Sequence, residues 1–149
     1  MSKIVIADST CLIGLSKIGK LDILQQLFGT ILIPAAVFHE VVVSGSGRPG
    51  AAEVESAGWI QTRDVVDRLA VNALRLSLGT GESEAIVLAS EEAADFIVLD
   101  DWQARQVAIG LSLPVIGTVA VLAKAAEKGL ISDLDSVVRE LREAGFYFL

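Results

Sequence analysis

The chain has 149 residues, of which 52% are hydrophobic and 21% charged, and this composition predicts one globular domain over residues 1–149. Its apolar runs are shorter than the roughly 18 residues of a transmembrane helix, so no membrane association is expected. The single cysteine, Cys11, cannot form an internal disulfide, which fits a cytoplasmic protein. Zinc sites and Cys/His catalysis are poorly supported, because His39 is the only histidine.

The net charge of −7 argues against a nucleic-acid-binding protein, because such proteins usually present a basic face. The argument weakens if several acids surround bound cations, since the cations reverse the local electric field. The charge alone therefore leaves a metal-dependent nucleic-acid enzyme open.

The first predicted element is a strand over residues 3–7 that ends at an acid. Its apolar, β-branched residues are typical of a strand buried on both faces of a parallel sheet. Asp8 follows directly, and helices are predicted over 8–18 and 21–28. Ligands of open α/β sheets bind beyond the carboxyl ends of the strands, so Asp8 is a candidate functional residue.

The middle of the chain continues the alternation of strands and helices. A strand is predicted over 30–33, followed by a helix over 34–43 that begins at Pro34 and carries Glu40. A Ser- and Gly-rich loop follows over 44–50. The next predicted elements are a short helix (51–57), an edge strand (59–62) and a helix with a wide apolar stripe (65–78).

The last part of the chain begins with the helix breaker Gly79-Thr80-Gly81. A strand ending in Asp100 and Asp101 is predicted over 96–99. The remaining predictions are helices over 82–90, 102–109, 119–128 and 132–142, the last capped by Ser132, and strands over 114–116 and 146–149. This alternation predicts an α/β fold with a mainly parallel sheet.

The acids Asp8, Glu40, Glu84 and Asp100 lie at strand ends or near helix starts that this topology brings together, which indicates a metal site. Each has a purely structural alternative. Asp8 can serve as a helix cap, and Glu40 can be a solvated helix acid. Glu82 and Glu84 can complement the helix dipole or form a capping box with Gly81, and Asp100 or Asp101 can cap the next helix.

Five blocks resemble, in this order, the motif blocks of PIN-domain proteins. They are IADSTCLI (6–13), IPAAVFHEV (33–41), LGTGESEAIVLA (78–89), VLDDWQAR (98–105) and IGTVAVL (116–122). The last block resembles that of a prokaryotic subgroup similar to the VapC-type toxins. The resemblance spans nearly the whole chain and implies a three-layer α/β/α sandwich with a five-stranded parallel sheet.

The resemblance also implies a ribonuclease that uses Mg²⁺ or Mn²⁺ to cleave single-stranded RNA, with a cognate antitoxin as a partner if the chain is a toxin. Asp8 matches the first acid of the family and Glu40 the second. Glu84 best matches the third, with Glu82 as its competitor, and Asp100 the fourth, with Asp101 as its competitor. Thr10 matches the hydroxyl position that steadies the first acid. Carboxylate oxygens are the ligands that these hard cations prefer.

Two further expectations concern Thr118 and the assembly state. Thr118 follows Gly117 at a helix start, where it can contact a phosphate or act as a plain N-cap. The apolar stripes of helices 22–28 and 65–78 predict a homodimer, which the resemblance also implies. The alternative to an enzyme is a catalytically inactive PIN-like module for protein interaction, which the acidic charge favours.

Overall fold

The computed structural model describes residues 3–146, which contain one five-stranded sheet in the order β3-β2-β1-β4-β5 with every neighbouring pair parallel. The predicted α/β fold with a parallel sheet is therefore confirmed. The strands are β1 (Val5–Ala7), β2 (Ile31–Pro34), β3 (Ile60–Arg63), β4 (Phe96–Val98) and β5 (Val115–Ile116).

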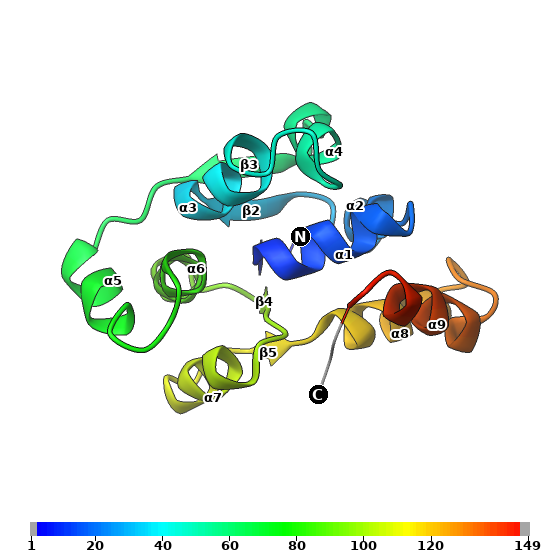
Figure 1. Cartoon of the computed structure of the whole chain (residues 1–149). Helices are drawn as coiled ribbons and strands as arrows, with labels where there is room; N and C mark the ends of the chain where they lie inside the picture. Colours follow the sequence, from blue (N-terminus) through cyan, green and yellow to red (C-terminus); the bar gives the residue numbers. More distant parts are fainter. Residues whose placement is uncertain (1–2, 147–149) are drawn as a thin grey trace.

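Helices cover both faces of this sheet, which gives the three-layer arrangement. Figure 1 shows α1, α2, α8 and α9 gathered on one side of β1 and β4, and α6 and α7 on the other. The helical elements are α1 (Ser9–Lys17), α2 (Asp22–Phe28), α3 (Ala35–Phe38), the π-helical turn η1 (His39–Val43), α4 (Ala51–Ser56), α5 (Arg68–Leu74), α6 (Thr80–Glu91), α7 (Trp102–Gly110), α8 (Thr118–Glu127) and α9 (Leu134–Glu143).

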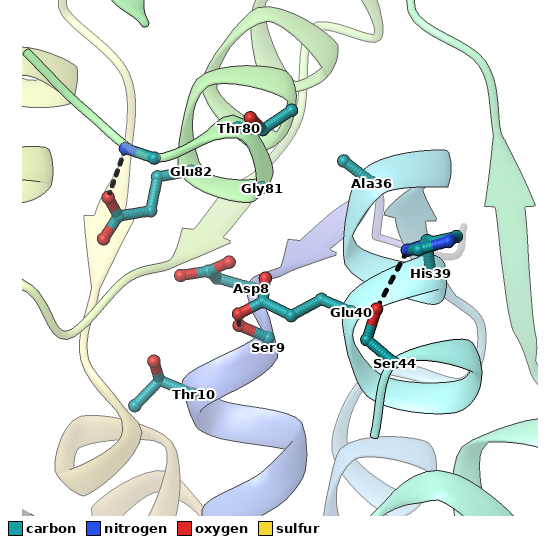
Figure 2. Close-up of a pocket in the computed structure, with 11 residues that line it drawn as sticks. Asp8, Ser9, Thr10, Ala36, His39, Glu40, Ser44, Thr80, Gly81 and Glu82 are labelled. Carbon is teal, nitrogen blue, oxygen red and sulfur yellow. Dashed lines mark hydrogen bonds between the residues drawn. The ribbon is translucent and has the colours of Figure 1, made fainter. Parts of the chain in front are cut away.

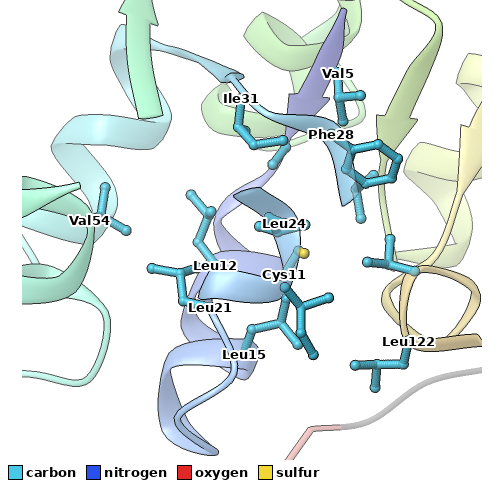
Figure 3. Packing of buried hydrophobic residues seen from close by; sticks show 14 of the residues in the cluster. Val5, Cys11, Leu12, Leu15, Leu21, Leu24, Phe28, Ile31, Val54 and Leu122 are labelled. Atoms are coloured by element: carbon cyan, nitrogen blue, oxygen red, sulfur yellow. The ribbon is translucent and has the colours of Figure 1, made fainter. Parts of the chain in front are cut away.

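The apolar run of β1 explains why it is the central strand. Val5, Ile6 and Ala7 are all fully buried, and because side chains alternate along a strand they serve two different cores. Val5 and Ala7 join the core under α1, α2 and α8, whereas Ile6 joins the core under α6 and α7. Figure 3 shows the first core, where Leu12, Leu24 and Leu122 converge below β1.

Three predicted helices differ from those observed. The predicted helix 65–78 is reduced to α5, which begins after Asp67, because the Asp67 side chain accepts the N–H of Ala70 as an N-cap. Similarly Asp133, and not Ser132, caps α9 by accepting the N–H of Ser136. The predicted helix 34–43 is divided into α3 and η1.

The strand predicted over 146–149 lies largely outside the described residues, and Phe146 itself is in no strand. In the part of the chain that the structure describes, no helix combines the length and apolarity needed to cross a membrane.

Candidate metal centre

Asp8 lies where β1 ends and α1 begins. Its backbone N–H donates to the carbonyl oxygen of Val98 on the neighbouring strand β4 at 3.3 Å. Only 3% of Asp8 is exposed, and its Oδ1 is buried without a hydrogen-bond partner. Asp8 is the N-cap residue of α1, but its side chain makes no capping hydrogen bond. The capping interpretation therefore does not account for this carboxylate.

The surroundings of Asp8 disfavour its ionised form. Burial, followed by the charges of Glu82, Glu40 and Asp100, raises the pKa of Asp8 from 3.8 to about 7, although the backbone N–H of Ser9 acts in the opposite direction. A bound cation would remove this penalty, because it interacts favourably with the ionised carboxylate.

Glu40 is brought to Asp8 by the π-helical turn η1, which is closed by a 2.8 Å hydrogen bond from the N–H of Ser44 to the carbonyl of His39. Such turns are rare and are often found at functional sites. The Ser9 hydroxyl donates to Oε1 of Glu40 at 3.1 Å, which ties η1 to the start of α1. Ser9 is not among the site residues predicted from the sequence, although its position directly after the strand-end acid is a usable signal.

Gly81 allows the first turn of α6 to approach both carboxylates. A Cβ atom at this position would lie 2.9 Å from Oε2 of Glu40 and 3.6 Å from Oδ1 of Asp8. The two oxygens therefore face the same small space beside the Gly81 backbone, where only a residue without a side chain leaves room between them.

These residues line a cavity of about 670 Å³ between α1, η1 and α6. In Figure 2 the Glu40 side chain reaches from η1 toward Asp8 and Ser9. His39 lies at the rim, with its Nδ1 3.3 Å from the Ser44 hydroxyl oxygen. The lining residues that carry polar side chains are Asp8, Ser9, Thr10, His39, Glu40, Ser44, Thr80 and Glu82.

The structure brings Glu82, and not Glu84, to this cavity. Oε1 of Glu82 accepts the N–H of Gly79 at 3.3 Å, so the helix cap is Gly79 and not the expected Gly81. Burial, then the nearby charges of Asp101 and Glu40, raise the pKa of Glu82. Its carboxylate belongs to the acidic cluster around Asp8.

Glu84, the acid preferred as the third one from the sequence, lies outside this cavity. Glu84 is 6% exposed, and its Oε1 accepts the N–H of Ala36 at 3.0 Å while its Oε2 pairs with Arg68 at 2.9 Å. It does not line the cavity. Glu84 accepts one N–H at the start of α3 and pairs with Arg68 of α5, so it connects α6 to both helices.

After β4, Asp100 lies outside the lining of this cavity, although its charge acts on Asp8, and Asp101 caps α7. Asp101 accepts the N–H of Ala104 at 2.9 Å. Asp100 accepts the N–H of Thr118 at 2.8 Å and its hydroxyl at 2.6 Å. Burial raises the pKa of Asp100, whereas these hydrogen bonds and then Arg105 lower it.

The two predicted supporting threonines have different positions. Thr118 is fully buried and gives both of its donors to Asp100, so it supports an acid, and Gly117 is the N-cap residue of α8. Thr10 is exposed at the cavity rim. It does not donate to Oδ1 of Asp8, and the neighbouring Ser9 makes the supporting contact, to Glu40.

The donor set suits a hard divalent cation, because it consists of carboxylates and includes a buried oxygen with no other partner. Among residues 3–146, no three Asp, Glu, His or Cys side chains are close enough to hold one ion as they stand. The acids thus converge without forming a complete coordination shell, and Mg²⁺ usually keeps several waters of its own.

Comparison with known proteins agrees with this architecture. The fold is similar to that of a PilT N-terminus domain protein from the hyperthermophilic archaeon Sulfolobus solfataricus, with a TM-score of 0.58, 19% sequence identity, and coverage of 82% of this chain and 92% of that chain. No curated protein sequence matches the chain. Residues 4–149 match the family DUF3368, which is described as a PIN domain. The chain therefore belongs to the PIN-domain family.

Proposed function

We propose that the protein is a metal-dependent ribonuclease that hydrolyses phosphodiester bonds of single-stranded RNA. The observation that carries this proposal is the buried, unpartnered Oδ1 of Asp8 in a cavity that Glu40 and Glu82 also line. Membership of the PIN-domain family, whose members are generally nucleases, supports it.

In this proposal Asp8, Glu40, Glu82 and Asp100 hold Mg²⁺ or Mn²⁺, directly or through water. Such a cation, when bound, activates water and stabilises charge on the phosphate and the leaving oxygen. Ser9 keeps Glu40 in place, and Thr118 keeps Asp100 in place. No protein nucleophile is required in this proposal, and none of the residues that line the cavity is a cysteine, while His39 lies at its rim.

The test is cleavage of a labelled single-stranded RNA by pure protein. We expect cleavage with Mn²⁺ or Mg²⁺, none with a chelator, and a loss on the order of 10²-fold or more in Asp8→Asn, as is typical when a charge-stabilising group is removed from an active site. Asp22→Asn, which makes the same charge change away from the cavity, serves as the control. Cleavage that survives chelation, or full activity of Asp8→Asn, would contradict the proposal.

A toxin role with a cognate antitoxin is a narrower proposal, supported by the resemblance of residues 116–122 to the VapC-like subgroup. Induced expression of the protein should then stop cell growth, and Asp8→Asn should not. Co-expression of a small DNA-binding protein encoded beside it should restore growth. Unimpaired growth with active protein in the cells would count against a toxin.

We also propose a homodimer, but with α5 as its centre. The apolar stripe of α2 packs against the core of its own chain, because Ile23, Leu24 and Phe28 are buried. Leu69 on α5 is 80% exposed, and Val66 and Leu76 beside the helix are 84% and 90% exposed. Exposed large apolar side chains gathered on and beside one helix are typical of an interaction site. It also fits the alternative of an inactive interaction module, which the cleavage test separates from an enzyme.

Light scattering at micromolar concentration should give the mass of two chains, and Leu69→Asp combined with Leu76→Asp should give the mass of one. These charges would be buried without partners in a dimer but stay solvated in the monomer. Lys128→Asp, an exposed change outside this surface, is the control. A monomeric wild-type protein would refute the dimer.

Gly81→Ala should strengthen the fold yet weaken metal binding. Alanine in the first turn of α6 should add about 0.4–1 kcal/mol to the free energy of unfolding, because it restricts the unfolded chain and Gly81 is not at a positive φ. Its methyl group would meet Oε2 of Glu40 at 2.9 Å and displace this flexible carboxylate. Melting temperatures with and without Mn²⁺ should therefore show a higher metal-free value and a smaller metal-induced rise.

Gly110→Ala on α7 is the matched control, because a methyl group there meets nothing within 4 Å. It should leave the metal-induced rise unchanged. An undiminished rise in Gly81→Ala would mean that the space between Glu40 and Asp8 does not hold the cation.

A further inference from the structure

A second cavity, of about 370 Å³, lies at the end of α1 that is remote from Asp8. It is bordered by the last turn of α1, by the start of α2 and by α4, which Figure 1 shows beside the corner that α1 and α2 form. Gly19 makes this corner with a φ of 68°, and the N–H of Lys20 closes it by donating to the carbonyl oxygen of Leu15 at 2.8 Å. A cavity of this volume is large enough for a small molecule.

The side chains that line this cavity give it a negative charge. Asp22 at the start of α2 and Glu53 on α4 line it, and no lysine or arginine of the described residues 3–146 does. Lys17 donates instead to a carbonyl oxygen after α9, and Lys20 lines a different cavity. The two ion pairs found within residues 3–146 involve neither Asp22 nor Glu53. The carboxyl end of α1 adds the negative end of a helix dipole, so the cavity favours a cation.

Ser16 adds a buried hydrogen-bonding group to the same cavity. Only 9% of Ser16 is exposed, and within residues 3–146 its Oγ is one of two buried side-chain oxygens that have no hydrogen-bond partner, the other being Oδ1 of Asp8. Buried polar groups are normally satisfied, so an unpartnered hydroxyl at a cavity indicates a ligand that supplies the partner. Glu53 also keeps an acceptor for it, because Oε1 alone receives the N–H of Gly50, at 3.3 Å.

Trp59 gives the cavity an aromatic wall. It directly precedes β3, is half-buried and packs against the core. Of the aromatic side chains, the indole attracts cations most strongly. Leu21 and Ala57 add apolar surface that methylene groups can contact. The acidic cavity at Asp8 differs, because among the described residues no Trp, Tyr or Phe lines it. The cavity at Trp59 therefore suits a cation that also carries a hydrocarbon chain.

We propose that this cavity binds a short aliphatic diamine. Its two ammonium groups would pair with Asp22 and Glu53, which approach from different helices, so that its two positive charges balance the two carboxylates. One ammonium N–H would supply the missing partner of the Ser16 hydroxyl, and the methylene chain would lie against Trp59. The site does not depend on the proposed nuclease chemistry, because none of its residues lines the cavity at Asp8.

The test is calorimetric titration of the pure protein with diaminobutane, and with butanediol as an uncharged ligand of the same carbon chain. We expect one equivalent of diaminobutane to bind and butanediol not to bind. Glu53→Gln should weaken the binding of diaminobutane about tenfold, the scale for losing a hydrogen bond to a charged group. Glutamine can still accept the N–H of Gly50. Glu55→Gln, the same charge change on α4 but outside the cavity, is the matched control and should leave Kd unchanged.

Two further variants connect the binding to this cavity. Ser16→Ala should weaken the binding of diaminobutane and raise the melting temperature of the amine-free protein, because it removes a buried hydroxyl that has no partner. In Trp102→Phe, Trp59 is the only tryptophan, and its emission should change as diaminobutane is added.

Asp8→Asn should bind diaminobutane as the wild-type protein does, and melting temperatures establish that each variant is folded. Equal Kd values for Glu53→Gln and Glu55→Gln would overturn the inference. Binding that is lost in Asp8→Asn would overturn it as well, since the amine would then occupy the acidic cavity. RNA cleavage is scored separately, so a failure of the proposed function would leave these titrations unaffected.

Discussion

Glu84→Ala should lower the free energy of unfolding by about 3 kcal/mol, which is the scale for losing hydrogen bonds to a buried charged group. The substitution removes the acceptor for the N–H of Ala36 and the partner of Arg68. Glu82→Ala should cost no more than about 1 kcal/mol, because it loses one capping hydrogen bond to Gly79 and also removes a carboxylate that is unfavourably placed among other acids. Thermal or urea unfolding measures both.

The losses of RNA cleavage should follow the opposite order, with the larger loss in the Glu82 variant. Glu82→Ala should lose metal-dependent cleavage on the order of 10²-fold, because it removes a charge from the proposed site. Glu84→Gln should keep most of it at temperatures where the protein is folded, since an amide oxygen can still accept the Ala36 N–H. A stable Glu84→Ala that does not cleave RNA would instead restore Glu84 as the third acid.

This pair of residues shows where sequence reasoning reaches its limit. The apolar runs that end at Asp8 and Asp100 predicted the central strands and the edge of the sheet at which the acids meet. Glu82 and Glu84, however, stand only two residues apart after the same helix start, and the family motif admits either. Glu84 differs from Glu82 because its side chain accepts the N–H of Ala36 at the start of α3. This contact joins residues that are 48 positions apart in the chain.

Other features were also decided by contacts that local patterns do not carry. The π-helical turn that directs Glu40 toward Asp8 is closed by Ser44, which the sequence assigns to a loop. The stripe of residues 65–78 has helical spacing, but Val66 and Leu76 lie outside α5 and are exposed. Thr118 lies beside Asp100 because it directly follows β5 and Gly117, whereas its position at a helix start predicted only a phosphate contact or an N-cap.

The stability of the metal-free protein should fall as the pH rises from about 4 to about 7. Because burial and neighbouring acids raise the pKa of Asp8 from 3.8 to about 7, the folded state retains a proton in this range that the unfolded state has released. Below pH 4 both states are protonated and there is no penalty. Above about pH 7 both are ionised and the penalty is complete, at about 4 kcal/mol for a difference of this size.

Asp8→Asn removes this ionisation, so its stability should exceed that of the wild-type protein at pH 8 and approach it at pH 4. The pKa values of Glu82 and Asp100 are also raised, so the free energy of unfolding of both proteins should keep a further decrease with rising pH. Comparing the two by urea unfolding across this range isolates the contribution of Asp8. Equal stabilities at pH 8 would mean that Asp8 is not held in an unfavourable ionised state.

A divalent cation should offset this penalty in the wild-type protein but not in Asp8→Asn. A cation that binds only the folded state adds RT ln(1 + [L]/Kd), or about 2.7 kcal/mol at a hundredfold excess over Kd. We expect millimolar Mn²⁺ or Mg²⁺ to raise the melting temperature at pH 8, and to do so much less near pH 4, because protonated carboxylates do not bind these ions. Asp8→Asn should lose most of the rise at pH 8 despite its greater metal-free stability, whereas Asp22→Asn should keep it. A full metal-induced rise in Asp8→Asn would show that the cation binds elsewhere, and the inactive interaction module would then be the better description.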